Sequence, residues 1–270
     1  MIDFPVAPSI DIWTLYISAT VVAWFFGIAF LAFHVIDMRT RGILQWGVAY
    51  LLIAVALLAN IFRHTLPVVV YGVGATALFV VGVILLDAGT RVGAQRGVPV
   101  LDVALPVVAV ALNLVFTFAV PSIAIRLEVL FVSVAIGTTR TAVRLICQGR
   151  RANGALHVAL LTFSAFYTVL ALTMITIALL AAVLGPIQDV VGRHPIHAVL
   201  LPALVLFFIG SAMSKLWVHY MRAYEEAQRA ATTDPLTNVR NRRYILPELE
   251  RIVQRSKREN RTLACMMLDA

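Results

Sequence analysis

Two stretches of this sequence contain side chains that could bind a metal ion or a small ligand. The first is QDVVGRHPIH, residues 188–197, in which His194 and His197 are three positions apart and could begin a metal site. Two histidines without further cysteine, histidine or carboxylate ligands nearby make a poor zinc signature. A plain loop and an external patch that senses a ligand both fit these residues. The candidate residues of the patch are Asp189, Arg193, His194 and His197.

The second stretch lies at the end of the sequence. Residues 263–268 read LACMML, an unbroken apolar run that is followed directly by Asp269. Such a run predicts a buried central strand that delivers a carboxylate to its end. A hard carboxylate in that position suits Mg²⁺, although a strand can also end at an acidic residue that has no catalytic role.

Several ionisable residues interrupt long apolar stretches, and each is a potential functional site because burying it in lipid is costly. Most lie toward the ends of these stretches, where a long charged side chain reaches the interface, so their positions explain them. Lys215 and Trp217 suit an interfacial anchor at the end of the last stretch. The ionisable residues in question are His34, Asp87, Asp102, Arg126, Glu128, Arg140, Arg144 and His157.

The composition indicates which elements must position these residues. The chain is 61% hydrophobic and 13% charged, with a mean hydropathy of +0.90, whereas charged residues make up roughly a quarter of a soluble domain. We therefore expect a mainly α, polytopic membrane bundle of about seven transmembrane helices over residues 1–218. The predicted spans are 12–36, 43–62, 66–87, 99–119, 123–146, 155–184 and 198–218.

The distribution of charge predicts the orientation of the bundle and argues against one class of partner. Arginines are concentrated in the first, third and fifth connections, so the positive-inside rule places the N-terminus outside and the tail in the cytoplasm. Residues 215–270 hold half of all Lys, Arg, Asp and Glu side chains, and the net charge of +8 divides evenly between them and the rest. The basic balance therefore reflects loops and tail, and we expect no nucleic-acid partner.

Beyond the last span, residues 219–233 predict a cytoplasmic helical linker. The segment lacks Gly and Pro and is rich in Ala, Glu, Arg and Gln. A thin stripe at three- and four-residue spacing could pair two chains in a short parallel coiled coil, and a solvated stalk is the alternative. The stripe consists of Tyr220, Ala223, Ala227 and Ala230.

A new structural unit is predicted to begin at Asp234, because Asp followed by Pro matches a helix N-cap with proline at the first position. Asn241 suits the N-cap of a further helix that runs to about Glu259. That helix has one apolar face at helical spacing. The face consists of Ile245, Leu246, Leu249, Ile252 and Val253.

This arrangement resembles the start of a GGDEF domain, the catalytic domain of diguanylate cyclases. The resemblance covers residues 234–270, and Asn238 stands where the family usually has Gly. The signature loop and the guanine- and phosphate-binding residues that follow it in the family are absent, so we expect the 270-residue chain to be an N-terminal part and inactive by itself. The residues that carry the match are Asp234, Leu236, Thr237, Asn241, Arg242 and Arg243, then the amphipathic helix and the strand that ends at Asp269.

The resemblance implies a homodimer, formed through the linker and the output domain, that condenses two GTP molecules into cyclic di-GMP with Mg²⁺. Asp269 matches the first metal-ligand aspartate of the family, and Arg242 and Arg243 match residues that anchor the start of the domain. The family context implies the inner membrane of a bacterium. Two other functions stay open: a degenerate GGDEF module that regulates a following phosphodiesterase domain, and a seven-helix receptor or transporter whose tail is incidental.

Overall fold

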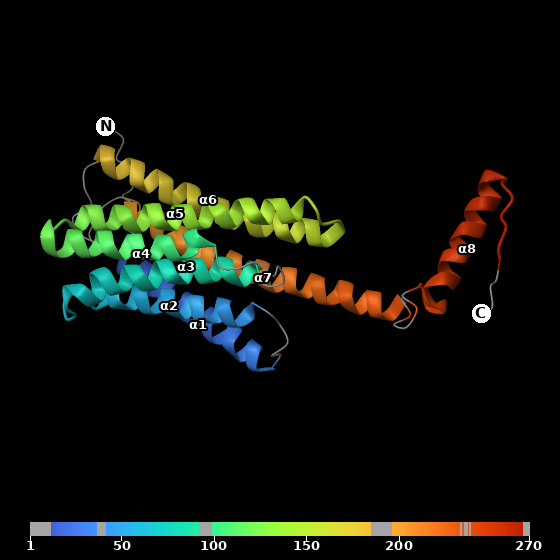
Figure 1. The fold of residues 1–270 in the computed structure, drawn as a ribbon, viewed down its shortest axis with the longest axis horizontal. Coiled ribbons are helices and arrows are strands. Elements are labelled where there is room, and N and C mark those ends of the chain that lie inside the picture. Colours follow the sequence, from blue (N-terminus) through green and yellow to red (C-terminus); the bar gives the residue numbers. More distant parts are fainter. Residues whose placement is uncertain are drawn as a thin grey trace, which may run out of the picture. The chain divides into compact units, whose positions relative to one another are not determined.

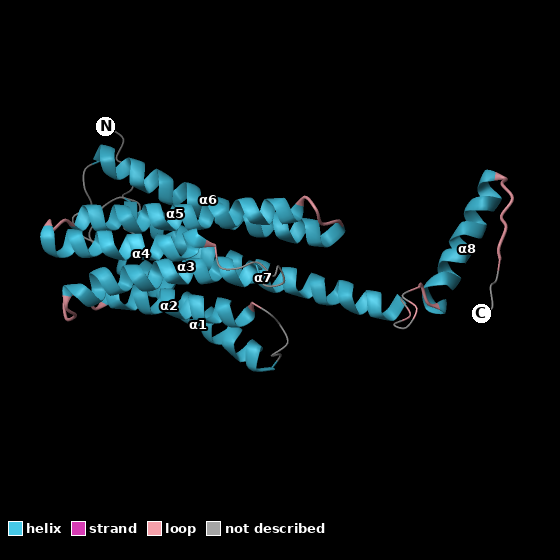
Figure 2. Ribbon diagram, in the orientation of Figure 1, coloured by secondary structure: helices cyan, strands magenta, loops and turns pink. Residues whose placement is uncertain are grey.

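The computed structural model describes residues 12–36, 42–91, 99–184, 196–232, 234, 237 and 239–266. Over these residues the regular structure is helical, and no β-strand occurs in them (Figure 2). The elements follow one another as labelled in Figure 1. They are α1 (Ile12–Ile36), α2 (Ile43–Ile61), the π-helical turn η1 (Val69–Gly74), α3 (Ala75–Arg91), α4 (Val100–Leu114), the π-helical turn η2 (Val115–Ala119), α5 (Ile123–Gly149), α6 (Gly154–Leu184), α7 (Ile196–Thr232) and α8 (Arg242–Glu259).

Seven spans among the described residues are long and apolar enough to cross a membrane, which confirms the predicted multi-pass protein. η1 with α3 forms one span, and α4 with η2 forms another. The first six spans begin and end within a few residues of the predicted ranges. The seventh extends to Thr232, so the predicted linker is a direct continuation of α7.

Short connections bring consecutive helices together in the bundle. The most extensive contacts join α1 to α2, α2 to α3, and α5 to α6, and α3 also contacts α4 and α5. Gly42, at the start of α2, has a φ of 94°, and a Cβ there would clash with the carbonyl oxygen of Gly89. Only glycine fits this close approach between α2 and the end of α3.

Aromatic side chains fill a large part of the bundle core. Phe30 of α1 stacks on Tyr50 of α2 with ring centroids 5.7 Å apart, and Tyr167 of α6 meets Phe207 of α7 edge-on at 5.0 Å. The exposed surface of the bundle helices is rich in large apolar side chains, and this is the surface that a bilayer would cover. Phe25, Val107, Leu172 and Leu206 are each more than half exposed.

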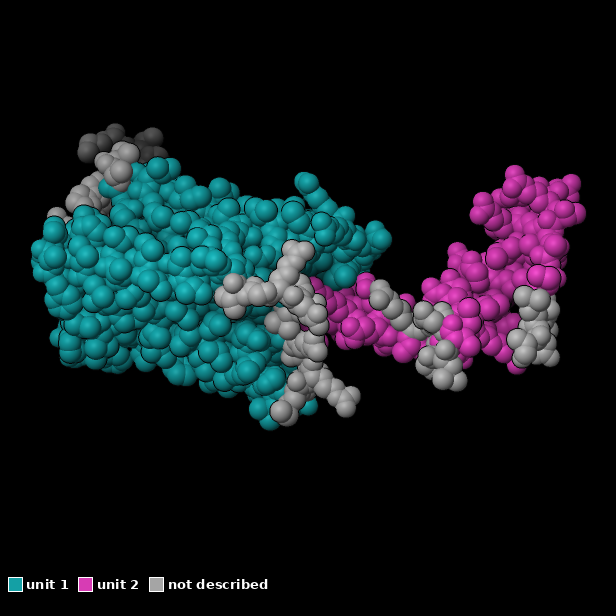
Figure 3. Space-filling model, in the orientation of Figure 1, with its two compact units in different colours: residues 1–216 teal, residues 217–270 magenta. Residues whose placement is uncertain are grey.

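The chain divides into two compact units, residues 1–216 and 217–270 (Figure 3). The second unit contains the end of α7, a short junction and α8. The predicted helix after Asn241 is confirmed, since α8 ends at Glu259 and Asn260 adopts the left-handed C-cap conformation, with a φ of 49°. No residue of α8 is buried, so its apolar face is uncovered in the described chain.

The predicted strand over residues 263–268 does not appear in the part that the structure describes. Residues 261–266 have no regular structure, and Leu263 and Met266 are exposed. Residues 267–270, including Asp269, lie outside the described residues. The strand at the start of an α/β domain therefore stays a prediction.

Candidate functional site

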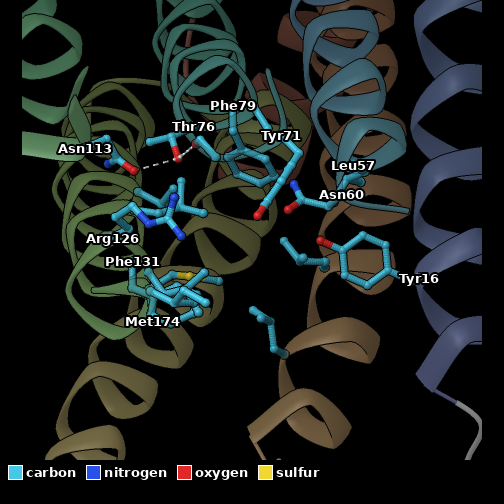
Figure 4. A pocket seen from close by; sticks show the side chains of 18 of the residues that line it. Tyr16, Leu57, Asn60, Tyr71, Thr76, Phe79, Asn113, Arg126, Phe131 and Met174 are labelled. Atoms are coloured by element: carbon cyan, nitrogen blue, oxygen red, sulfur yellow. Dashed lines mark hydrogen bonds between the residues drawn. The ribbon is translucent and has the colours of Figure 1, made fainter. Parts of the chain in front are cut away.

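A pocket within the bundle collects side chains from all seven spans (Figure 4). It lies toward the end of the bundle where α1 begins and α2 ends, as its lining by Tyr16 and Asn60 indicates. Its cavity measures about 80 Å³, which is room for several water molecules or a small organic group. Most of its wall is apolar. Leu57, Phe79, Leu127, Phe131, Met174 and Leu204 form much of that wall.

Arg126 is the charged residue of this pocket. It lies in the first turn of α5, where the side chain of Ser122 caps the helix by accepting a hydrogen bond from the amide of Ile125 at 3.3 Å. One guanidinium nitrogen of Arg126 donates to Thr117 Oγ1 at 3.2 Å. Its Nε is buried and has no hydrogen-bond partner among the described residues. None of the ion pairs found in the described residues involves Arg126.

Further polar groups face the same cavity. In Figure 4 the guanidinium of Arg126 and the hydroxyl groups of Tyr16 and Tyr71 point toward a common space. Thr76 Oγ1 lies 3.4 Å from Asn113 Oδ1 and donates to the carbonyl oxygen of Gly72 at 2.9 Å. Asn113 is fully buried, so the pocket contains polar groups that the protein fixes before any ligand arrives.

The two π-helical turns shape the pocket around Arg126. η1 contributes Tyr71 and Gly72, and η2 contributes Thr117, the partner of the guanidinium. A Cβ on Gly72 would lie 2.7 Å from a guanidinium nitrogen of Arg126, so the glycine makes the space that the arginine occupies. Both turns, η1 at the start of the third span and η2 at the end of the fourth, thus lie against one charged group.

At the other end of the bundle, the intramembrane carboxylates are paired with arginines. Arg144 donates to both oxygens of Asp87, at 2.6 and 2.7 Å, and Thr141 donates to the same carboxylate at 3.0 Å. Asp102 binds Arg140 at 2.8 Å. Arg91 joins the two halves of this cluster, because it contacts both Asp87, at 3.2 Å, and Asp102. The cluster ties α3, α4 and α5 together, so these residues are more than interfacial charges.

The position of Lys215 differs from the position that the sequence predicted. We expected an interfacial anchor, but Lys215 is fully buried in the bundle. Its Nζ donates to Tyr50 Oη at 3.3 Å. The same Nζ lies 5.0–5.9 Å from four ring centroids, close enough for cation–π contact with rings from α2 and α6. The four rings belong to Trp46, Tyr50, Phe163 and Tyr167.

The junction after α7 brings part of the predicted domain-start motif together. Asp234 Oδ1 accepts hydrogen bonds from the amide and the hydroxyl of Thr237, at 3.0 and 3.1 Å. Asn241 Oδ1 accepts from the amide of Tyr244 at 3.2 Å, and its Nδ2 donates to the carbonyl oxygen of Ala231 at 2.9 Å. Asn241 therefore caps the start of α8 and binds the end of α7 with one side chain.

Two further details concern the start of this motif. Thr237, which donates two hydrogen bonds to Asp234, lies in a turn. Residues 235, 236 and 238 lie outside the described residues, so the predicted helix N-cap at Asp234 stays a prediction. Arg242 and Arg243 occupy the first turn of α8 with exposed side chains.

The remaining predicted residues fall where the structure gives no side-chain description. Leu236, Asp269 and three residues of the predicted sensing patch, Asp189, Arg193 and His194, lie outside the described residues, and so does the side chain of His197. Among the described residues, no group of three His, Cys, Asp or Glu side chains could hold a metal ion. The patch and the Mg²⁺ ligand stay predictions.

Comparison of this chain with protein-family models, curated proteins and solved structures finds no match.

Proposed function

We propose that residues 1–218 form the membrane sensory part of a signalling protein, and that the output is a diguanylate cyclase domain that begins at residue 234. A ligand in the Arg126 pocket would alter the bundle, and α7 would carry the change to the output domain. The resemblance of residues 234–270 to the start of a GGDEF domain supports the nature of the output. The geometry of the pocket and of α7 supports the sensory role.

The continuity of α7 is the observation that carries the proposal. Leu200, Leu201 and Leu204 of α7 line the pocket. Lys215 of the same helix lies among the four aromatic rings from α2 and α6. The helix then continues without a break to Thr232. A continuous helix that lines a pocket near one end and leads into a second unit at the other offers a path by which a change at the pocket could reach that unit.

The junction fits an output domain that starts directly after α7. Asn241 N donates to the carbonyl oxygen of Thr232 at 3.0 Å, and Asp234 N donates to that of Val239 at 2.8 Å. These bonds, with the side-chain bonds of Asn241, hold the start of α8 against the last turn of α7. The uncovered apolar face of α8 then suits packing against the rest of an α/β domain.

In the proposed reaction, the ribose 3′-hydroxyl of each GTP loses its proton and attacks the α-phosphate of the other GTP. Two phosphodiester bonds form and two pyrophosphates leave. Bound Mg²⁺ would polarise the α-phosphate and activate the hydroxyl. Asp269 would supply a hard carboxylate to the metal. Each of two copies of the chain would bind one of the two GTP molecules. The linker helix and the output domain would form the dimer.

Cyclic di-GMP synthesis by the complete protein, purified and supplied with GTP and Mg²⁺, tests the proposal. Asp269→Asn should abolish synthesis, because it removes the negative charge that the metal needs and keeps the size of the side chain. Glu250→Gln, on the exposed surface of α8, is the matched control and should leave synthesis unchanged. Undiminished synthesis by Asp269→Asn would contradict the assignment of the metal ligand. GTP binding without synthesis by the wild type would favour a degenerate regulatory module.

A further inference from the structure

We propose that the Arg126 pocket binds a small organic monoanion, a carboxylate or similar oxyanion on a short apolar chain. This inference deepens the proposed function by naming the class of ligand that the bundle detects. Binding itself requires only residues 1–218, so it can be measured apart from any output. The charge of the ligand follows from Arg126 and its apolar part from the wall of the pocket.

The hydrogen-bonding capacity of Arg126 is largely unused. A guanidinium has five N–H donors, and the described residues give that of Arg126 a single acceptor, Thr117 Oγ1. The buried Nε–H has none. An arginine in a low-dielectric site that lacks a counter-ion is costly, and a carboxylate matches its planar fork with two parallel hydrogen bonds. An anionic ligand would satisfy both the charge and the free donors.

Three other arginines of the bundle differ from Arg126, because each forms an ion pair with a carboxylate of the protein. Arg91, Arg140 and Arg144 each contact Asp87 or Asp102, which are almost completely buried. The protein thus supplies carboxylates to three membrane arginines, and the described residues supply none to Arg126. The missing partner is at the pocket, where a ligand can provide it.

The rest of the wall defines the body of the ligand. Leucine, phenylalanine and methionine side chains form most of the surface away from Arg126, so the chain or ring attached to the anionic group must be apolar. Thr76 and Asn113 are polar residues of the cavity wall and would lie near the anionic group of the ligand. A cavity of about 80 Å³ limits the ligand to a short chain.

The direct test uses three probes with the same four-carbon chain: butanoate, 1-butanol and butylammonium. Binding to the purified 270-residue chain in phosphatidylcholine nanodiscs is measured by calorimetric titration. Butanoate should bind at least about tenfold more tightly than either other probe, because a hydrogen-bonded charge pair contributes that much. Arg126→Gln should lose about tenfold or more in butanoate affinity and leave 1-butanol binding unchanged, which also verifies that the variant pocket is intact.

Two variants refine the result. Arg126→Lys keeps the charge and loses the planar fork, so its butanoate affinity should fall between those of the wild type and Arg126→Gln. Arg150→Gln is the matched control, since Arg150 follows the last residue of the same helix and is exposed. It should bind butanoate like the wild type.

The anion could reach the pocket from solution or as a lipid head group. Nanodiscs that contain phosphatidylglycerol separate these sources: weaker butanoate binding there identifies the lipid as the occupant, and unchanged binding identifies a free anion. Equal affinities for butanoate and 1-butanol, or an unchanged butanoate affinity in Arg126→Gln, would overturn the proposal. Because the assay needs no nucleotide, a failure of cyclic di-GMP synthesis would leave this inference standing, and the reverse also holds.

Discussion

Asp87 is the residue at which the ion-pair cluster of the bundle can be tested most sharply. Its side chain is nearly fully buried and contacts Arg91, Thr141 and Arg144. Asp87→Asn leaves Arg144 without its counter-ion, and we expect it to reduce the free energy of unfolding of the bundle by about 3 kcal/mol. Thermal or denaturant unfolding in detergent measures the loss.

The double variant Asp87→Asn/Arg144→Gln separates pairing from simple loss of contacts. Because it removes both charges, its loss of stability should be smaller than the sum of the two single losses by about 1 kcal/mol or more. Arg150→Gln, whose exposed side chain has no ion pair among the described residues, should change stability little. Additive losses would show that Asp87 and Arg144 act independently.

Lys215 offers a second test at the scale of single residues. Lys215→Ala leaves a cavity among four aromatic rings and should cost about 2–5 kcal/mol of stability. Lys215→Met fills the same space without an amine and should stay within about 1 kcal/mol of the wild type, because the desolvation of a buried amine offsets much of its attraction to the rings. Equal losses in the two variants would mean that the amine, rather than the packing of the side chain, holds α7 in the bundle.

Among the elements, the helices could be predicted from the sequence, whereas the rotation of each helix against its neighbours could not. Long apolar stretches and capping residues such as Asn241 are local signals, so the spans and α8 could be predicted. The burial of Lys215 and the pairing of Asp87 with Arg144 depend on how each helix is rotated against its neighbours. A single sequence carries no direct record of that rotation.

The pocket could not be predicted from the sequence for a similar reason. Arg126 was recognisable as an ionisable residue inside an apolar stretch, and its position near a helix end suggested an interfacial role. Its role in a pocket depends on Gly72 and Thr117, which lie in π-helical turns of two other spans. π-helical turns have no strong local sequence pattern, so neither the turns nor the cavity could be predicted.

Asn241 tests the junction between α7 and α8. Asn241→Ala removes both the cap of α8 and the bond to Ala231, and should speed hydrogen exchange in the first turn of α8 about fivefold, as expected for a lost cap of about 1 kcal/mol. Asn241→Asp keeps the acceptor and loses the donor. It should protect α8 like the wild type while the last turn of α7 exchanges faster. Identical exchange in all three proteins would contradict the bridging role of this side chain.

At the scale of the whole molecule, the orientation of the bundle decides which compartment the pocket faces. The arginine-rich odd connections predict that Arg151 is cytoplasmic and that residues 186–196 are external. The pocket would then open toward the outside. Reporter fusions after Arg151 and within 186–196 measure this directly, with activity of a cytoplasmic reporter expected at the first position and of a periplasmic reporter at the second. The opposite pattern would invert the molecule and place the pocket toward the cytoplasm.

Together, the two proposals state that an anion bound at Arg126 controls synthesis of cyclic di-GMP. The most direct measurement is the rate of synthesis by the complete protein in nanodiscs, with GTP and Mg²⁺, as butanoate is added to the wild type and to Arg126→Gln. The wild-type rate should change about fivefold or more, the lower range of allosteric coupling, and the variant's rate should not respond. A rate that butanoate leaves unchanged in the wild type, or changes equally in both proteins, would contradict the claim.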